Sequence, residues 1–332
     1  MPDAVASGRA QARLGLLGNP SDGYGGRVIA ATVADFGAVA RACPAPQWTI
    51  RHDDNVVEAG SIFELRDAVG DSGGRATLVG AALAIVSLDA PEIAEGPPLE
   101  LSAETTVPRE VGLAGSSAIV TATLRAVVAS RGVALTPSRL AELTLGAEVR
   151  VLGWAAGPQD RIIQAHGGAL DMDFGDGWRP DAWKPIDPSA LPPLIVAWDT
   201  RTTASSDVVH RDVRTRWEAG DAEVVASMGR FAELAAEGSH ALAAGEAAAR
   251  WPDLLDESYG LRERFWHLTA RDRTMIELAR AHDIGASLAG SGGAIVGVAR
   301  DPERVDGFLA AINSSGARAM VPTIGRPAAG GR

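Results

Sequence analysis

Apolar runs interrupted by glycine, proline and polar residues divide the first half of the chain into predicted strands and helices. Short apolar runs, or strict alternation of apolar and polar side chains, predict strands over residues 13–18, 27–42, 48–52 and 99–106. Longer segments rich in helix-forming residues predict helices over residues 61–70, 75–89, 116–131, 137–150 and 158–166. Gly132, directly after the third of these helices, is a typical helix end.

The pattern changes after a connection marked by prolines at 185, 188, 192 and 193. A buried strand is predicted over residues 194–198, followed by alanine- and arginine-rich helices to about residue 283. A glycine-rich hairpin over 285–299, a helix over 301–313 and a last strand complete this half, and we expect the tail, 325–332, to be disordered. We therefore predict two domains, residues 1–190 and 191–325.

Composition and charge narrow the classes of protein. The 332 residues are 46% hydrophobic and 22% charged, which excludes a disordered or collagen-like chain. A net charge of −11 argues against non-specific nucleic-acid binding, although a local basic pocket remains compatible with it. The single cysteine, Cys43, excludes an internal disulfide. We see no apolar run long enough for a membrane helix and no signal peptide, so we expect a cytoplasmic protein without a membrane partner. The oligomeric state stays open.

The most informative segment for chemistry is residues 108–118, Pro-Arg-Glu-Val-Gly-Leu-Ala-Gly-Ser-Ser-Ala, directly before a predicted helix. Glycines let the backbone approach a ligand, and the N–H groups and dipole of a following helix favour a phosphate. An ordinary glycine turn with a serine N-cap would look the same locally. Neither the GxxxxGK[ST] loop nor GxGxxG occurs in the chain.

Two further segments carry glycines or carboxylates in suggestive positions. Gly290–Gly293 lies between two apolar runs, which by itself indicates a hairpin turn. Pro158 predicts a helix start with Asp160 in its first turn, and Glu148 lies near the end of the preceding predicted helix. The two carboxylates could converge on a metal and a proton, but a good helix start and a solvated helix face explain them equally well.

Taken together, the segments resemble the GHMP kinase superfamily. The matching stretches are ARLGLLGNPSDGYGG (12–26), PREVGLAGSSA (108–118) and LAGSGGAIVGV (288–298), and GPQDRIIQAHGGALDMDF (157–174) is most similar to the glucuronokinases. The resemblance implies an α+β, two-domain fold. Residues 1–190 would form a ribosomal S5 domain 2-like, ATP-binding N-terminal domain, and residues 191–325 a ferredoxin-like C-terminal domain.

The same resemblance implies roles for individual residues. Asp160 would face the acceptor hydroxyl as base or electrostatic anchor, with Arg13 beside it, and Asp22 would accept a sugar hydroxyl. Gly292, in the C-terminal motif, would contribute to the substrate site. The implied ligands of the ATP phosphates are Gly112, Leu113, Ala114, Gly115, Ser116, Ser117 and Ala118. The implied ligands of Mg²⁺ are Ser116 or Ser117, together with Glu148.

Departures from the family pattern narrow the range of possible substrates. Asn19-Pro20 replaces the Glu-His pair of galactokinases, which argues against galactose, and Lys184 is the only lysine, which argues against mevalonate. Ala114 interrupts the common Gly-Leu-Gly-Ser-Ser loop, so either serine could meet the metal.

A uronate substrate needs a cation for its carboxylate, and arginine binds both oxygens at once. Arg161 is the first candidate, followed by Arg211, Arg214 and Arg216, for which a solvated helix face is the alternative. The resemblance implies an ATP- and Mg²⁺-dependent sugar-1-kinase that converts D-glucuronate to D-glucuronate 1-phosphate. The alternatives are a kinase for galacturonate, a heptose, a neutral hexose or a mevalonate-type molecule, and a non-catalytic nucleotide or sugar sensor.

Overall fold

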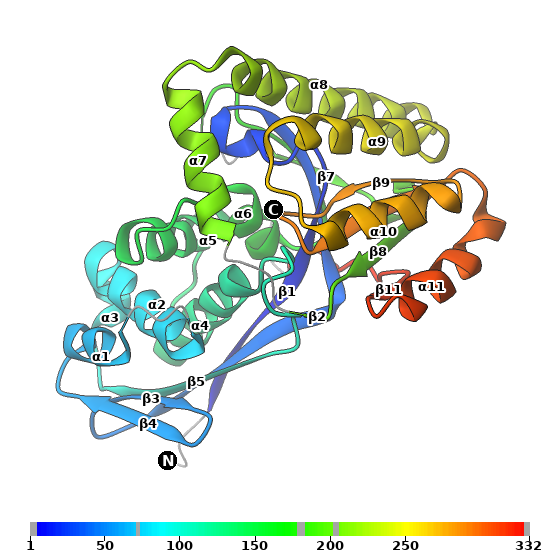
Figure 1. The fold of residues 1–332 in the computed structure, drawn as a ribbon. Helices are drawn as coiled ribbons and strands as arrows, with labels where there is room; N and C mark the ends of the chain where they lie inside the picture. Colours follow the sequence, from blue (N-terminus) through cyan, green and yellow to red (C-terminus); the bar gives the residue numbers. More distant parts are fainter. Residues whose placement is uncertain (1–4, 71–73, 178–182, 202–205, 329–332) are drawn as a thin grey trace.

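The structure, a computed structural model, describes residues 5–70, 74–177, 183–201 and 206–328. Within these ranges it contains a seven-stranded sheet and a four-stranded sheet, each covered by helices (Figure 1). The strands of the first sheet are β1 (Ala6–Leu17), β2 (Arg27–Pro44), β3 (Trp48–His52), β4 (Asn55–Ala59), β5 (Leu99–Thr105), β6 (Ala169–Asp173) and β7 (Trp183–Ile186). The strands of the second sheet are β8 (Leu194–Trp198), β9 (Ile284–Leu288), β10 (Ala294–Ala299) and β11 (Arg318–Met320).

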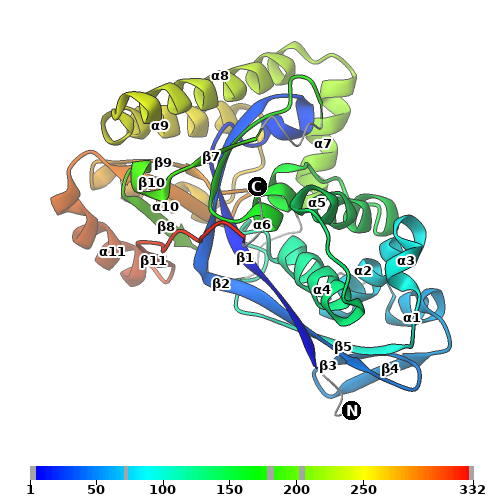
Figure 2. The same cartoon turned by 180° about the vertical axis from the view of Figure 1, so that it is seen from behind.

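The first sheet has the order β4-β3-β5-β2-β6-β7, with β1 paired to β2. Its pairings are antiparallel except for β3 with β5. One group of helices lies together on one side of this sheet (Figures 1 and 2). These helices are α1 (Ile62–Val69), α2 (Arg75–Asp89), α3 (Pro91–Ala94), α4 (Gly115–Arg131), α5 (Pro137–Gly146) and α6 (Gln159–His166).

The second sheet is antiparallel throughout, in the order β11-β8-β10-β9. The predicted strand over 194–198 and the hairpin over 285–299 are both confirmed. The helices of this half are α7 (Ser206–Glu218), α8 (Ala222–Ala244), α9 (Ala247–Phe265), α10 (Ala270–Ala281) and α11 (Val305–Ser314). Among the described residues, no helix is both long enough and apolar enough to span a bilayer.

The long β1–β2 hairpin belongs to both hydrophobic cores. Val28 packs with the helices of the first half, whereas its neighbour Ile29 packs in one cluster with Phe231 and Trp251 of the second half. Because successive strand residues point to opposite faces, one hairpin can serve two cores. The domain boundary near residue 190 stays a prediction, since the second core extends across it.

The C-terminal segment returns to the first sheet. Ile324 forms a bridge with Val33, Pro327 forms one with Gly167, and the N–H of Gly325 donates to the carbonyl oxygen of Thr32 at 2.9 Å. The prediction of a disordered tail is therefore wrong for residues 325–328, because backbone hydrogen bonds hold them. Residues 329–332 lie outside the described part of the chain.

Two features of the helices prepare the functional site. Helix α4 begins at Gly115 and ends at Gly132, which adopts the left-handed conformation as the sequence predicts. The helix predicted over 137–150 is α5 followed by a wider π-helical turn, η2 (Ala147–Val151). Such turns are frequent at functional sites, and here Glu148 lies on the turn with 0% of its surface exposed.

Candidate active site

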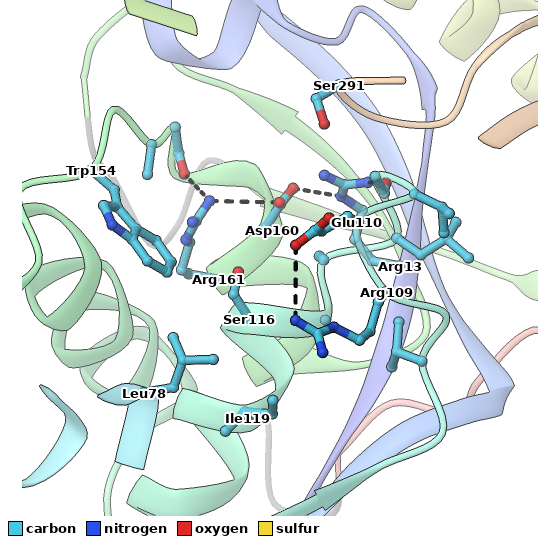
Figure 3. A pocket seen from close by; sticks show the side chains of 18 of the residues that line it. Arg13, Leu78, Arg109, Glu110, Ser116, Ile119, Trp154, Asp160, Arg161 and Ser291 are labelled. Atoms are coloured by element: carbon cyan, nitrogen blue, oxygen red, sulfur yellow. Dashed lines mark hydrogen bonds and ion pairs between the residues drawn. The ribbon is translucent and has the colours of Figure 1, made fainter. Parts of the chain in front are cut away.

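A cavity of about 670 Å³ lies where the loop after β1, the first turns of α4 and α6, and the β9–β10 turn meet. This volume is typical of small-molecule sites. Arg13 and Asp160 lie at one end, and Leu78, Ile119 and Trp154 lie apart from them (Figure 3). Of the tryptophans that the structure describes, Trp154 lines the cavity. The cavity therefore has a charged end and an apolar wall.

The predicted phosphate loop forms part of the cavity wall. Gly112 has φ +71° and Ala114 has φ +59°, so the chain turns twice through the left-handed region before α4 begins. No side chain caps this helix, and its first N–H groups carry the positive end of the helix dipole. Residues 112–116 line the cavity, whereas Ser117 and Ala118 are fully buried and do not. The backbone at 112–116 is thus arranged to receive an anion.

The two glycine clusters pack against each other, backbone against backbone. A Cβ atom on Gly290 would lie 2.2 Å from the carbonyl oxygen of Gly112, and one on Gly112 would lie 2.8 Å from the carbonyl oxygen of Gly292. Any side chain there would push the loops apart. Ser291 lines the cavity, while Gly292 does not. The Gly290–Gly293 turn therefore also braces the phosphate loop, and a substrate contact by Gly292 stays a prediction.

Arg13, on β1, connects the charged end of the cavity to both glycine clusters. Its Nε donates to Oδ1 of Asp160 at 2.5 Å, and its Nη1 donates to the carbonyl oxygens of Gly112 and Ala289, each at 2.8 Å. Only 5% of the residue is exposed. Three acceptors in fixed positions hold the guanidinium in one orientation. A positive charge therefore stands beside Asp160 and behind the phosphate loop.

Two carboxylates, Asp22 and Asp160, line the same end of the cavity. Asp160 lies in the first turn of α6, and Asp22 lies on the single turn η1 (Ser21–Tyr24) after β1. Burial raises the pKa of Asp22 to about 6, although the N–H of Gln159 donates to it at 3.0 Å and the guanidinium of Arg13 also lowers it. Asp22 therefore takes up a proton in mildly acidic solution, where an exposed aspartate would stay charged.

Glu148, Ser117 and Arg161 form a buried cluster. The Ser117 hydroxyl donates to the Glu148 carboxylate at 3.1 Å, and Nε of Arg161 donates to the same carboxylate at 2.5 Å. A hydroxyl and a carboxylate are ligand types that Mg²⁺ accepts, commonly together with phosphate oxygens and water. Among the described residues, no three His, Cys, Asp or Glu side chains come together in a way that could hold a metal ion. Ser116 lies on the cavity wall, whereas Ser117 and Glu148 do not line the cavity and Glu148 is paired with Arg161, so an Mg²⁺ site on these residues stays a prediction.

The arginines considered for a substrate carboxylate lie in different surroundings. Arg161 is 6% exposed and is committed to Glu148, although its side chain also reaches the cavity wall. Arg214 lines the cavity. Arg216 is ion-paired and does not line it. The side chain of Arg211 lies outside the described part of the chain.

Arg262, on α9, is a residue of this region that sequence reasoning missed. It is fully buried, its Nη1 donates to the carbonyl oxygen of Gly290 at 2.7 Å, and its Nη2 donates to that of Asn19 at 2.8 Å. Its guanidinium also lies 4.9 Å from the ring centroid of Trp266. Burial, followed by repulsion from Arg13, lowers its pKa to about 9. Arg262 thus ties the loop after β1 to the C-terminal glycine cluster, and nothing in its sequence neighbourhood distinguishes it from surface arginines.

Comparisons with known proteins identify relatives over most of the chain. The family model for the GHMP kinases N terminal domain matches residues 77–168, and the one for the GHMP kinases C terminal matches residues 231–318. Glucuronokinase 1 of Arabidopsis thaliana is 33% identical over 314 residues, covering 88% of this chain and 84% of that protein. Probable glucuronokinase 2 of the same plant is 34% identical over 315 residues, covering 89% and 84% respectively.

A solved structure supports the same grouping at the level of the fold. Lactococcus lactis galactokinase complexed with galactose superimposes with a TM-score of 0.77 at 17% identity, covering 96% of this chain and 93% of that one. The two-domain α+β fold expected from the sequence resemblance is therefore confirmed.

Proposed function

The chain belongs to the GHMP kinase family and is thus an ATP-dependent kinase, and on this premise we propose that it phosphorylates the anomeric hydroxyl of a sugar acid. The expected substrate is D-glucuronate and the expected product is D-glucuronate 1-phosphate, in keeping with the similarity to the glucuronokinases. The observation that carries the proposal is the Arg13–Asp160 ion pair, because it stands in the cavity next to an anion-binding loop.

The cavity suggests how the nucleotide lies. The apolar wall of Leu78, Ile119 and Trp154 suits a purine base, which stacks on aromatic and aliphatic surface. The N–H groups of residues 112–116, at the start of α4, suit the phosphates. In this arrangement the γ-phosphate points toward the charged end of the cavity.

The residues at that end supply positioning and charge neutralisation, which are the main requirements of phosphoryl transfer. Asp160 accepts the hydrogen bond of the anomeric hydroxyl and takes its proton as the new P–O bond forms and the bond to the departing ADP breaks. Arg13 stabilises the negative charge of Asp160, and Asp22 accepts a second sugar hydroxyl. Ser116, Ser117 and Glu148 would hold Mg²⁺, which when bound would neutralise charge on the phosphates of ATP.

The test measures ADP release with Mg-ATP against glucuronate, galacturonate, glucose, galactose, a heptose and mevalonate. We expect the highest kcat/KM with glucuronate. The Asp160→Asn variant should lose roughly 100-fold to 10,000-fold in kcat, because the group that accepts the proton is gone. Its unfolding midpoint should fall only modestly, and by an amount comparable to that of the control variant below, because each replacement removes the charge that pairs with a largely buried arginine while leaving an oxygen that accepts its hydrogen bond.

A matched control is Asp171→Asn. Asp171 forms a comparable buried pair with Arg27, whose Nε donates to it at 2.7 Å, but it does not line the cavity. This variant should be less stable and keep its kcat. Near-normal turnover of Asp160→Asn would contradict the proposed role of Asp160, and nucleotide binding without turnover on any sugar would favour a sensor.

A further inference from the structure

Five arginines line the cavity among the described residues: Arg13, Arg75, Arg109, Arg161 and Arg214. A uronate carries its carboxylate on C5, which shares the ring oxygen with the anomeric carbon C1. The cation that binds the carboxylate must therefore lie near Asp160, at the charged end. Arg75, on α2, is ion-paired with Asp53, and Arg109, whose side chain is largely exposed, lies 3.9 Å from the carboxylate of its neighbour Glu110. Arg13, Arg161 and Arg214 remain as candidates for binding the carboxylate.

Two of these three have their donors committed to protein acceptors. Arg13 donates to Asp160 and to two backbone carbonyl oxygens. Arg161 donates to Glu148, which has no exposed surface, and to the carbonyl oxygen of Gly157 at 2.8 Å. Turning either guanidinium toward a ligand would leave a buried carboxylate or carbonyl unpaired, which is costly.

Arg214, on α7, is held differently. Its Nη2 donates to the carbonyl oxygen of Gly23 at 2.6 Å, and its guanidinium carbon lies 4.5 Å from the ring centroid of Tyr24 and 5.6 Å from that of Trp217. Stacking on aromatic faces orients the planar group without using its N–H donors. An arginine has five such donors, and among the described residues Arg214 donates to one acceptor, the carbonyl oxygen of Gly23.

The attachment point of Arg214 also lies in the same part of the site. Gly23 directly follows Asp22 on η1, and both line the cavity together with Arg214, so the guanidinium is anchored one residue along the chain from the carboxylate expected to bind a sugar hydroxyl. Asp22 and Asp160 place negative charge at this end of the cavity. The carboxylate of a sugar acid that binds there is repelled by these two groups unless a cation lies beside it. We propose that Arg214 binds the carboxylate of the sugar acid and thereby selects a uronate over the neutral hexose, an inference that rests on the proposed function.

The experiment compares Arg214→Gln with wild type for kcat and KM on glucuronate, glucose and ATP. Without this charge-assisted contact to both carboxylate oxygens, KM for glucuronate should rise ~10-fold to 100-fold. KM for ATP and the weaker activity on glucose should stay within about twofold, so the preference for the uronate collapses. Arg214→Lys should recover part of the affinity for glucuronate, because it restores the charge without the planar fork.

Arg216→Gln is the matched control, since Arg216 lies two residues further along the same helix and pairs with Asp221 at 2.9 Å, outside the cavity. It should behave as wild type. An Arg214→Gln enzyme that keeps the preference for glucuronate, or loses glucose and glucuronate activity equally, overturns the inference while leaving the proposed function intact. A wild-type enzyme that phosphorylates no uronate overturns the proposed function itself.

Discussion

Replacing Asp22 by asparagine should stabilise the protein at neutral and alkaline pH. Asp22 is 8% exposed, and its burial raises the pKa from 3.8 to about 6. An unfolded chain keeps the ordinary value, so the folded state binds more protons than the unfolded state between these two pKa values. Stability therefore falls as pH rises through this window and stays reduced above it. A pKa difference of one corresponds to ~1.4 kcal/mol, so charged Asp22 costs the folded state ~3 kcal/mol near pH 8.

Asparagine removes the charge without leaving a hole. Its side chain has the same shape, and its carbonyl oxygen can still accept the bond from the N–H of Gln159. Urea denaturation of the variant and the wild type, measured from about pH 4 to about pH 8, should show a difference that grows from near zero to ~3 kcal/mol. The variant should at the same time lose kcat/KM for the sugar, because an amide replaces a charged acceptor of its hydroxyl.

Asp187→Asn serves as a control of opposite sign. Asp187 is exposed, and the N–H and hydroxyl of Ser189 donate to it and hold its pKa below the ordinary value. Its charged form favours folding, so the replacement should be destabilising in neutral solution and lose that effect in acid. A stability gain for Asp22→Asn that is the same at every pH would refute the reasoning, because burial of a charge cannot then be its source.

Two backbone substitutions test the glycine loops. Gly290→Ala should lower the free energy of unfolding by about 1–3 kcal/mol and raise KM for ATP, since its Cβ would meet the carbonyl oxygen of Gly112; an unchanged KM for ATP would argue against the bracing role. Gly260→Ala, on α9 with open space around it, is the matched control and should be neutral or slightly stabilising. Ala114→Gly should raise the free energy of unfolding by about 0.5–1 kcal/mol, because it relieves a left-handed alanine. Urea denaturation measures this change in the free energy of unfolding, and a variant less stable than the wild type would show that Ala114 is not strained.

Local pattern predicted many elements of the fold but little of their pairing. The bounds of β3 and β8 agree with the apolar runs that predicted them, whereas β1 begins at Ala6 rather than at Arg13. Its first half has only isolated buried positions and is a strand because it pairs with β2. Strands β4, β6 and β7 were missed. β4 has no buried residue, and the parallel pairing of β3 with β5 has no local signature at all.

The site shows the same division between local and distant information. The glycine loop and the first turn of α6 follow from their own residues, and the family resemblance supplied the roles of Arg13 and Asp160. The contact of Arg262 with Asn19 joins residues 243 positions apart, so no local pattern could predict it. Glu148 resembles a solvated helix residue in sequence, and the π-helical turn that buries it depends on packing rather than on composition.

The return of residues 323–328 to the first sheet bears on how the protein is synthesised. The N–H of Ala34 donates to the carbonyl oxygen of Thr323 at 2.8 Å, and the N–H of Ala328 donates to the carbonyl oxygen of His166 at 2.7 Å. During translation, strand β2 is therefore made nearly 300 residues before its last partners exist. Pairings of such long sequence separation form slowly. The nascent N-terminal half leaves the ribosome with a sheet whose hydrogen bonding is completed only when the far end of the chain arrives.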